Sequence, residues 1–282
     1  MKELLTMWKY SRMIIMVALV AAIYAAILIP FKAIPLIPGV TELRPGNVIP
    51  VIFGLMFGPA GVWGSMLGNL SADIFGGTLG IPSISGIFGN FFFALIPYVV
   101  WGKVKGITSY GKPYMNKVKD YFEYIFVALI ASVGCGSIIG YILDAIGLYP
   151  FAVLGNIISL NNFVAAAILG PILLKILYPR VEKWGLIWTD IMDKKDYSEP
   201  SSFRAYLLTF CSIAAFVLGN YLSINVYGGM AFGEGFLQEG DLSVVNQVGL
   251  VLGLLPLMLM FVIAMVLPSR NKLKQDNLNN IA

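Results

Sequence analysis

The sequence predicts an all-α integral membrane protein, and three observations support this fold class. Hydrophobic residues make up 58% of the 282 residues and charged residues only 12%, whereas a soluble domain carries about 25% charged residues. The apolar residues form stretches close to the roughly 20 residues that a helix needs to cross a bilayer. The basic residues lie mostly in short segments between these stretches, as they do in multi-pass proteins.

Eight membrane spans are expected. No cleavage site of small residues follows the apolar core of the first span, so this span is expected to be retained. The second and third spans are short, and a Gly58-Pro59-Ala60-Gly61 turn separates them. They either form a pair whose turn stays within the membrane or are re-entrant and covered by neighbours. The spans cover residues 12–31, 47–58, 61–76, 82–102, 121–143, 150–178, 204–223 and 247–268.

The basic residues predict the orientation of these spans. With the N-terminus in the cytoplasm, 17 of the 19 lysines and arginines lie inside, and only Lys32 and Arg44 lie outside. This distribution agrees with the positive-inside rule. A single long span over 47–76 would place the basic loop 103–119 outside, so we reject it. Both termini are therefore expected in the cytoplasm, and the small net charge of +4 gives no reason to expect a nucleic-acid partner.

A polar segment divides the chain after the sixth span. Residues 179–203 are mixed in charge and bounded by Pro179 and Pro200. They predict a cytoplasmic linker between a six-helix core, residues 1–178, and two additional transmembrane helices with an outer loop, residues 204–268. Residues 269–282 are expected to form a cytoplasmic tail.

The composition excludes several kinds of chemistry. The sequence contains no histidine, which removes histidine metal sites and the dyads in which histidine activates serine or cysteine. Cys135 and Cys211 both lie inside apolar spans, so we expect buried packing residues and no disulfide. No GxxxxGK[ST] nucleotide loop is present. No cofactor and no metal ion are therefore expected.

Small residues follow one face of the first span. Ala18, Ala22 and Ala26 are four residues apart, so their methyl groups share a face that another helix backbone can approach closely. This face either packs within the chain or docks a separate membrane subunit. The third span shows two neighbouring stripes at the same spacing, a smooth one of Gly61, Gly64, Gly68 and Ala72 and a polar one of Ser65, Asn69 and Asp73.

The alanine stripe, the charged loop after it, and the strings PVIFGLMFGP and GSMLGNLSADIFGG resemble one known family. Over about residues 10–178 the chain resembles the substrate-binding S component of an energy-coupling factor (ECF) type ABC transporter. The resemblance implies that the chain captures a vitamin or related micronutrient at the outer face. It also implies delivery inward with a transmembrane scaffold subunit and two ATPase subunits. In this family the alanine face contacts the scaffold, a role we assign to Ala18, Ala22 and Ala26, and loop 32–47 covers the substrate.

Polar residues at membrane depth usually mark a site or a helix contact. Arg44 suits a carboxylate or phosphate on a ligand, or it pairs with Glu42. Asp73 either faces the pocket or meets water at the end of its helix. Asn69, one turn deeper, needs partners, which are either the ligand or a neighbouring helix. The expected substrate-binding residues are Glu42, Arg44, Asn47, Asn69, Asp73, Asn90, Asn156 and Asn161.

The asparagines of the sixth span do not all point the same way. Asn156 and Asn161 lie about 140° apart around a helix, so one or two of Asn156, Asn161 and Asn162 are expected to face the pocket. Together the amides and one arginine suit a polar, ring-containing vitamin or a nucleobase-like compound. A tetrapyrrole would find no histidine to ligate its metal.

Two other functions are open to a chain of this composition. A stand-alone secondary transporter would ordinarily use an ionisable residue near the midplane, and no span clearly offers one. An intramembrane enzyme with paired aspartates is poorly supported, because Asp73 and Asp144 both lie near the outer ends of their helices. We therefore expect a transporter subunit and no enzymatic activity.

Overall fold

A computed structural model describes residues 1–32, 34–37, 41–42, 44–107, 111–198, 201–226 and 244–266, and it is almost entirely helical over them. The predicted all-α membrane fold is confirmed, and helices occupy all eight predicted spans. Two of them are short, α3 (Val48–Phe57) and α4 (Pro59–Phe75). Six are long and apolar enough to cross a membrane: α2 (Ser11–Phe31), α5 (Ile81–Val100), α6 (Val118–Ala145), α7 (Phe151–Lys183), α9 (Ser202–Val226) and α10 (Val244–Val266).

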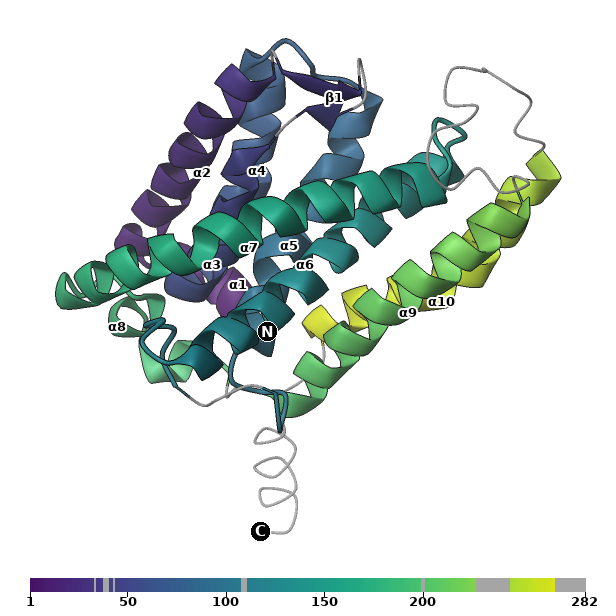
Figure 1. Cartoon of the computed structure of the whole chain (residues 1–282). Coiled ribbons are helices and arrows are strands. Elements are labelled where there is room, and N and C mark those ends of the chain that lie inside the picture. Colours follow the sequence, from purple (N-terminus) through teal and green to yellow (C-terminus); the bar gives the residue numbers. More distant parts are fainter. Residues whose placement is uncertain are drawn as a thin grey trace.

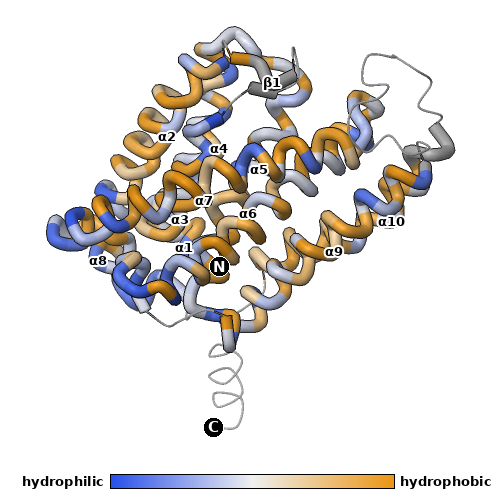
Figure 2. The backbone as a smooth tube through the Cα atoms, in the orientation of Figure 1, coloured by the Kyte–Doolittle hydropathy of each residue, from blue (hydrophilic) through white to orange (hydrophobic). Residues whose placement is uncertain are grey.

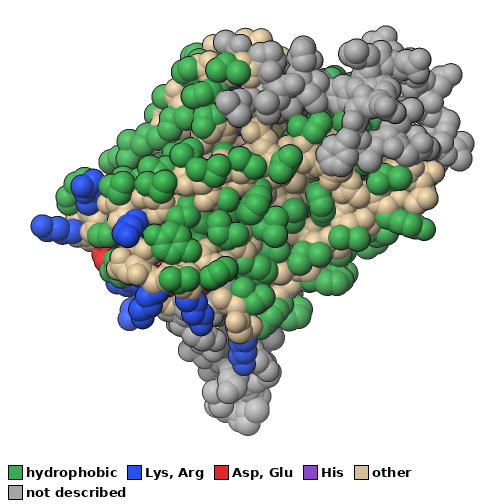
Figure 3. Space-filling model, in the orientation of Figure 1, with side chains coloured by type: hydrophobic (Ala, Val, Ile, Leu, Met, Phe, Trp, Pro, Cys, Tyr) green, Lys and Arg blue, Asp and Glu red, His purple; other side chains and the backbone are tan. Residues whose placement is uncertain are grey.

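The helices form one bundle (Figure 1), and hydropathy and charge distinguish its two ends. Helices α2, α9 and α10 are hydrophobic along most of their length, and hydrophilic residues gather near α8 (Trp188–Ile191) (Figure 2). On the face seen in Figure 3, the described Lys and Arg side chains gather at this same end. The opposite end carries a short antiparallel hairpin of β1 (Pro35–Ile37) and β2 (Thr41–Glu42) and is called the hairpin end below.

The turn between α3 and α4 depends on glycine. Gly58 has φ +48° and ψ −118°, a combination that residues with a side chain rarely adopt. Pro59 then begins α4, where its missing N–H costs no helical hydrogen bond. A Cβ atom on Gly61 would lie 2.2 Å from the carbonyl oxygen of Phe53. Helices α3 and α4 therefore form a tight pair, one of the two arrangements that the sequence leaves open, and the turn needs glycine at both positions.

The smooth stripe of α4 packs against α2. A Cβ on Gly64 would lie 2.5 Å from the Cβ of Val20, and one on Gly68 would lie 2.9 Å from the carbonyl oxygen of Ala21. The two helices approach this closely because neither glycine has a side chain. The polar stripe of α4 is consequently turned toward the interior of the bundle, where Asn69 and Asp73 are buried.

The two added helices pack on the side of the bundle away from α2 (Figure 1). Helix α9 contacts α5, α6 and α7, and α10 contacts α9 and α6. At the contact with α6, a Cβ on Gly134 would lie 2.7 Å from Oγ of Ser212. Helix α2 instead contacts α3, α4 and the short segments η1 (Met7–Lys9), η2 (Pro45–Asn47) and α8. The added helices therefore leave the alanine face uncovered.

The boundary between the sixth span and the linker differs from the sequence-based expectation. Helix α7 continues beyond Pro179 to Lys183, since a proline within the last two turns removes only one hydrogen bond from a helix of 33 residues. The expected linker therefore starts later, and it contains α8 and η3 (Lys194–Asp196). Most of the expected outer loop between the added helices and the tail 269–282 lie outside the described residues. Cys135 and Cys211 are both buried and free, in agreement with the prediction.

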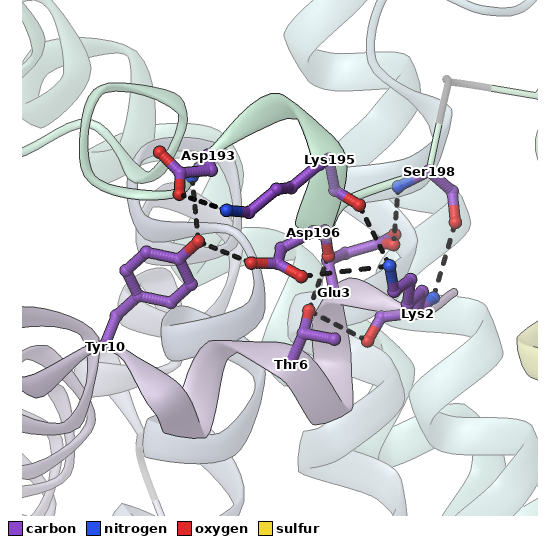
Figure 4. A network of polar contacts seen from close by, with 8 residues as sticks. All are labelled: Lys2, Glu3, Thr6, Tyr10, Asp193, Lys195, Asp196 and Ser198. Carbon is purple, nitrogen blue, oxygen red and sulfur yellow. Dashed lines mark hydrogen bonds and ion pairs between the residues drawn. The ribbon is translucent and has the colours of Figure 1, made fainter.

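Hydrogen bonds and an ion pair hold the N-terminal segment against this linker (Figure 4). Tyr10 donates from its hydroxyl to Asp196 Oδ2 at 2.7 Å, and Thr6 donates to the Asp196 carbonyl oxygen. Lys2 lies 3.8 Å from Asp196 Oδ1. Glu3, in the short helix α1 (Glu3–Thr6), accepts from the backbone N–H of Ser198 at 3.1 Å. The hydrogen bond from Tyr10 lowers the pKa of Asp196, nearby lysines add to this, and partial burial opposes it.

Candidate functional site

A cavity of about 260 Å³ opens near the hairpin end, between α2, α4, α5, α6 and α7. Part of its lining is apolar and includes Ile139, Leu143, Leu154 and Ile158. The rest of the lining is mostly polar and dominated by amides and hydroxyls. The polar lining residues are Lys32, Arg44, Asn47, Asn69, Asp73, Thr78, Ser83, Ser85, Asn90, Tyr149, Asn161 and Asn162.

A chain of charged and amide groups crosses the polar part of the lining. Lys32 Nζ donates to Asp73 Oδ1 at 2.8 Å, and both side chains are about nine-tenths buried. Asn69, one helical turn before Asp73, donates to Asp73 Oδ2 at 3.5 Å. Arg44 Nη1 donates to Asn69 Oδ1, also at 3.5 Å. The spacing of four residues in α4 therefore aligns Asn69 and Asp73 between two cations from other segments.

The position of Asn69 depends on a glycine in the facing helix. A Cβ atom on Gly86 would lie 2.8 Å from Asn69 Nδ2. Any side chain at position 86 would therefore press on the Asn69 amide. Gly86 is therefore a close-packing point between α4 and α5, and its effect is to admit a polar side chain to the cavity.

A second group of polar side chains forms the floor of the cavity. Tyr24 of α2 is fully buried, and its hydroxyl lies 2.9 Å from Asn47 Oδ1 and 2.8 Å from Asn90 Oδ1. Asn47 Nδ2 lies 2.5 Å from Asn162 Oδ1. Asn90 Nδ2 donates to the Gly86 carbonyl oxygen at 2.9 Å. The floor thus joins segments from four parts of the chain.

Most of the residues expected to bind substrate meet at this cavity. Six of the eight line it, namely Arg44, Asn47, Asn69, Asp73, Asn90 and Asn161. The side chain of Glu42 lies outside the described residues. Asn156 is not part of the lining, because its Nδ2 donates to Asn220 Oδ1 of α9 and to the Ala152 carbonyl oxygen, both at 2.6 Å. The roles of all eight residues in substrate binding remain predictions.

A protein-family model described as QueT transporter matches residues 14–179, more than half of the chain. The chain belongs to the QueT transporter family. The match begins in α2, ends near the end of α7 and leaves out α9 and α10. It covers nearly the same residues as the resemblance to S components and is consistent with it. Comparison with curated proteins and with solved structures gives no significant match.

Membership of the QueT transporter family decides between the two broad classes of function left open by the sequence, transporter and enzyme. The family is one of membrane transporters and not of enzymes, so the chain is a multi-pass membrane transporter component. Within the residues that the structure describes, no group of three or more His, Cys, Asp or Glu side chains could hold a metal ion.

The alanine face forms a shallow groove on the outside of this QueT family member. Ala18, Ala22 and Ala26 are exposed, and Ala25 beside them is buried. With Ser71 and Phe75 of α4 they line a groove of about 420 Å³. Packing among the described residues therefore uses the other face of α2, and none of them covers the smooth face.

The residues that the sequence does not predict include Lys32, which lines the cavity, and Tyr24, which lies behind the lining and contacts Asn47 and Asn90. The sequence predicts only that Lys32 lies outside, and nothing in its spacing indicates its pairing with Asp73. Tyr24 is not among the predicted site residues, although it follows Ala22 by two positions and therefore points to the opposite side of the same helix. Asp73 does not face water, which is one of its two predicted environments, because its ion pair with Lys32 leaves it only 7% exposed.

Proposed function

We propose that this chain is the S component of an ECF-type importer that captures a precursor of queuosine. The family it belongs to is associated with queuosine-precursor S components. Queuosine carries a 7-deazaguanine base, which has the size and the ring amide groups of a nucleobase. The observation that carries the proposal is the cavity at the hairpin end, whose lining combines asparagine side chains with aliphatic side chains.

The size and lining of the cavity support a small heterocycle. Ligand sites usually have volumes of about 300–1,000 Å³, and this cavity lies just below that range at about 260 Å³. A single ring system fits such a volume, whereas a tetrapyrrole is too large. The asparagine side chains offer both donors and acceptors to the ring edge, and Ile139 and Leu154 offer apolar surface to its faces.

The open alanine groove supports docking of a separate membrane subunit. Small residues let helix backbones approach closely in a bilayer, and Ala18, Ala22 and Ala26 are exposed along α2. The added helices α9 and α10 occupy the other side of the bundle and do not obstruct this face. The proposed partner is a transmembrane scaffold carrying two ATPase subunits, since the sequence has no nucleotide-binding loop of its own.

In the proposed cycle the hairpin end faces outward, and both termini are in the cytoplasm. The distribution of lysine and arginine supports this orientation. Substrate enters the cavity from outside under loop 32–47. The loaded protein then rotates in the membrane against the scaffold through the alanine face, and ATP hydrolysis by the partners drives release inward.

Uptake measurements test this proposal. Cells expressing the chain with the scaffold and ATPase subunits should accumulate labelled queuosine precursor, and cells expressing the chain alone should not. The chain should also co-purify with the scaffold. Equal uptake in the absence of the ATPase subunits would instead identify a stand-alone secondary transporter.

A further inference from the structure

Tyr24 lies on α2 between the alanine face and the cavity. The alanine face points outward, while Tyr24, two residues after Ala22, points into the bundle and is fully buried. Its hydroxyl contacts Asn47 and Asn90, which both line the cavity. Tyr24 itself is not part of the lining, so it acts on a ligand only through these amides.

The single hydroxyl proton of Tyr24 determines the orientation of the two amides that it contacts. Both amides lie with Oδ1 toward the Tyr24 hydroxyl, at 2.9 Å for Asn47 and 2.8 Å for Asn90. A phenol has a single proton to donate. One of the two amides must therefore turn by 180° and present its NH2 group to Oη.

The neighbouring contacts select which amide turns. Asn90 Nδ2 donates to the Gly86 carbonyl oxygen at 2.9 Å, and a turned Asn90 would place two acceptors against each other there. Asn47 is free of this restriction, because its other partner is the Asn162 amide, which also has both a donor and an acceptor. If Asn47 and Asn162 both turn, Asn162 directs its oxygen toward Cys135. The Cys135 thiol lies within hydrogen-bonding reach of Asn162 and can donate to this oxygen.

The result is a relay in which each group donates to the next, from Cys135 through Asn162, Asn47, Tyr24 and Asn90 to the Gly86 carbonyl oxygen. We propose that Tyr24 is the positioning residue of this relay and fixes the orientation of the amides on the cavity floor. Each amide then keeps one N–H and one oxygen lone pair for a ligand. This pattern pairs with the lactam or amidine edge of a planar ring. The ligand class rests on the proposed function, whereas the relay does not.

Replacement of Tyr24 by phenylalanine interrupts the relay and keeps the ring that fills the core. The N–H of Asn47 and the oxygen of Asn90 lose their buried partner, and both amides become free to turn. Tyr124 provides a matched control, because it is equally buried and donates to the Ala166 carbonyl oxygen at 3.1 Å, away from the cavity. Tyr124→Phe removes one buried hydroxyl without touching the floor.

The first measurement needs no ligand. In a Cys211→Ala background, Cys135 is the remaining cysteine of the chain, and its reaction with a small methanethiosulfonate reports how firmly the floor is held. Tyr24→Phe should raise the labelling rate about threefold or more by freeing Asn162, and Tyr124→Phe should not. Asn90→Ala cuts the relay at another point and should give the same increase. Equal labelling rates in Tyr24→Phe and Tyr124→Phe would overturn the relay.

The second measurement is the affinity for 7-deazaguanine. Tyr24→Phe should weaken binding by roughly tenfold, the effect of about one hydrogen bond between positioned groups, while Tyr124→Phe stays within about twofold. Unchanged affinity in Tyr24→Phe would overturn the positioning role. If the wild-type chain binds no 7-deazaguanine, the proposed substrate fails, and the labelling rates alone decide the relay.

Discussion

The side chain of Lys32 at the end of α2 donates to Asp73 near the end of α4 across 2.8 Å, beside the cavity. The Thr78 hydroxyl accepts a hydrogen bond from Lys32 and donates one to Asp73. Because α2 also carries the alanine face, this ion pair joins the proposed docking helix to a wall of the proposed binding site.

Removal of one partner of this ion pair should destabilise the protein. We expect Asp73→Asn or Lys32→Met to cost about 2 kcal/mol, less than the roughly 3–5 kcal/mol of a fully buried pair, because about a tenth of each side chain remains exposed. Lys112→Met removes the partner of Glu182 in a more exposed pair and should cost less than about 1 kcal/mol. Unfolding in mixed detergent micelles measures the three costs. The account is wrong if the double variant of Lys32 and Asp73 loses the full sum of the single losses.

Alanine at position 58 should destabilise the α3–α4 turn in two ways. Gly58 has φ +48°, and a Cβ there would lie 2.7 Å from the indole of Trp188. We expect Gly58→Ala to cost about 3 kcal/mol, the sum of backbone strain and overpacking. Gly77 has φ +69° with nothing within 4 Å of its added Cβ, so Gly77→Ala should show strain alone, about 1 kcal/mol. Addition of Trp188→Ala should recover part of the Gly58→Ala loss, and no recovery would exclude the steric contribution.

Bulk on the alanine face should abolish transport without affecting binding. Ala22→Trp fills the groove on α2 but lies away from the cavity. We expect at least about tenfold slower uptake and loss of scaffold co-purification, because close helix contact requires small residues. Val217→Trp places the same bulk on the exposed side of α9 and should leave uptake unchanged. Equal uptake in the two variants would show that this face of α2 does not dock the scaffold.

Acid should release the N-terminal segment from the linker. The pKa of Asp196 is lowered below its ordinary value of 3.8, first by the Tyr10 hydrogen bond. A lowered pKa means that the contact is fully present above about pH 3.8 and is lost as the pH falls through the lowered value. Tyr10→Phe should shift this loss to higher pH. Pepsin cleavage within residues 188–198, followed between about pH 2 and pH 5, measures it, and identical profiles for the two proteins would contradict the assignment.

The span pattern and the polar stripe of α4 could be predicted because both follow local periodicity. Ser65, Asn69 and Asp73 share a helix face at any tertiary arrangement, and the glycines beside them mark the packing face. The pairing of Lys32 with Asp73 and of Tyr24 with Asn90 could not be predicted, since each joins residues more than 40 positions apart. Asn156 and Asn161 show the same limit: their angular separation indicates that they face different partners, but only the position of α9 decides that Asn156 faces Asn220.

Equilibrium binding of 7-deazaguanine to the purified chain tests the central claim most directly. Asn69 lines the cavity between Arg44 and Asp73, whereas Asn156 bonds to α9. The account predicts saturable binding to the wild-type protein, a loss of affinity of about tenfold or more in Asn69→Leu, and little change in Asn156→Leu. Absence of saturable binding, or equal losses in the two variants, would contradict it.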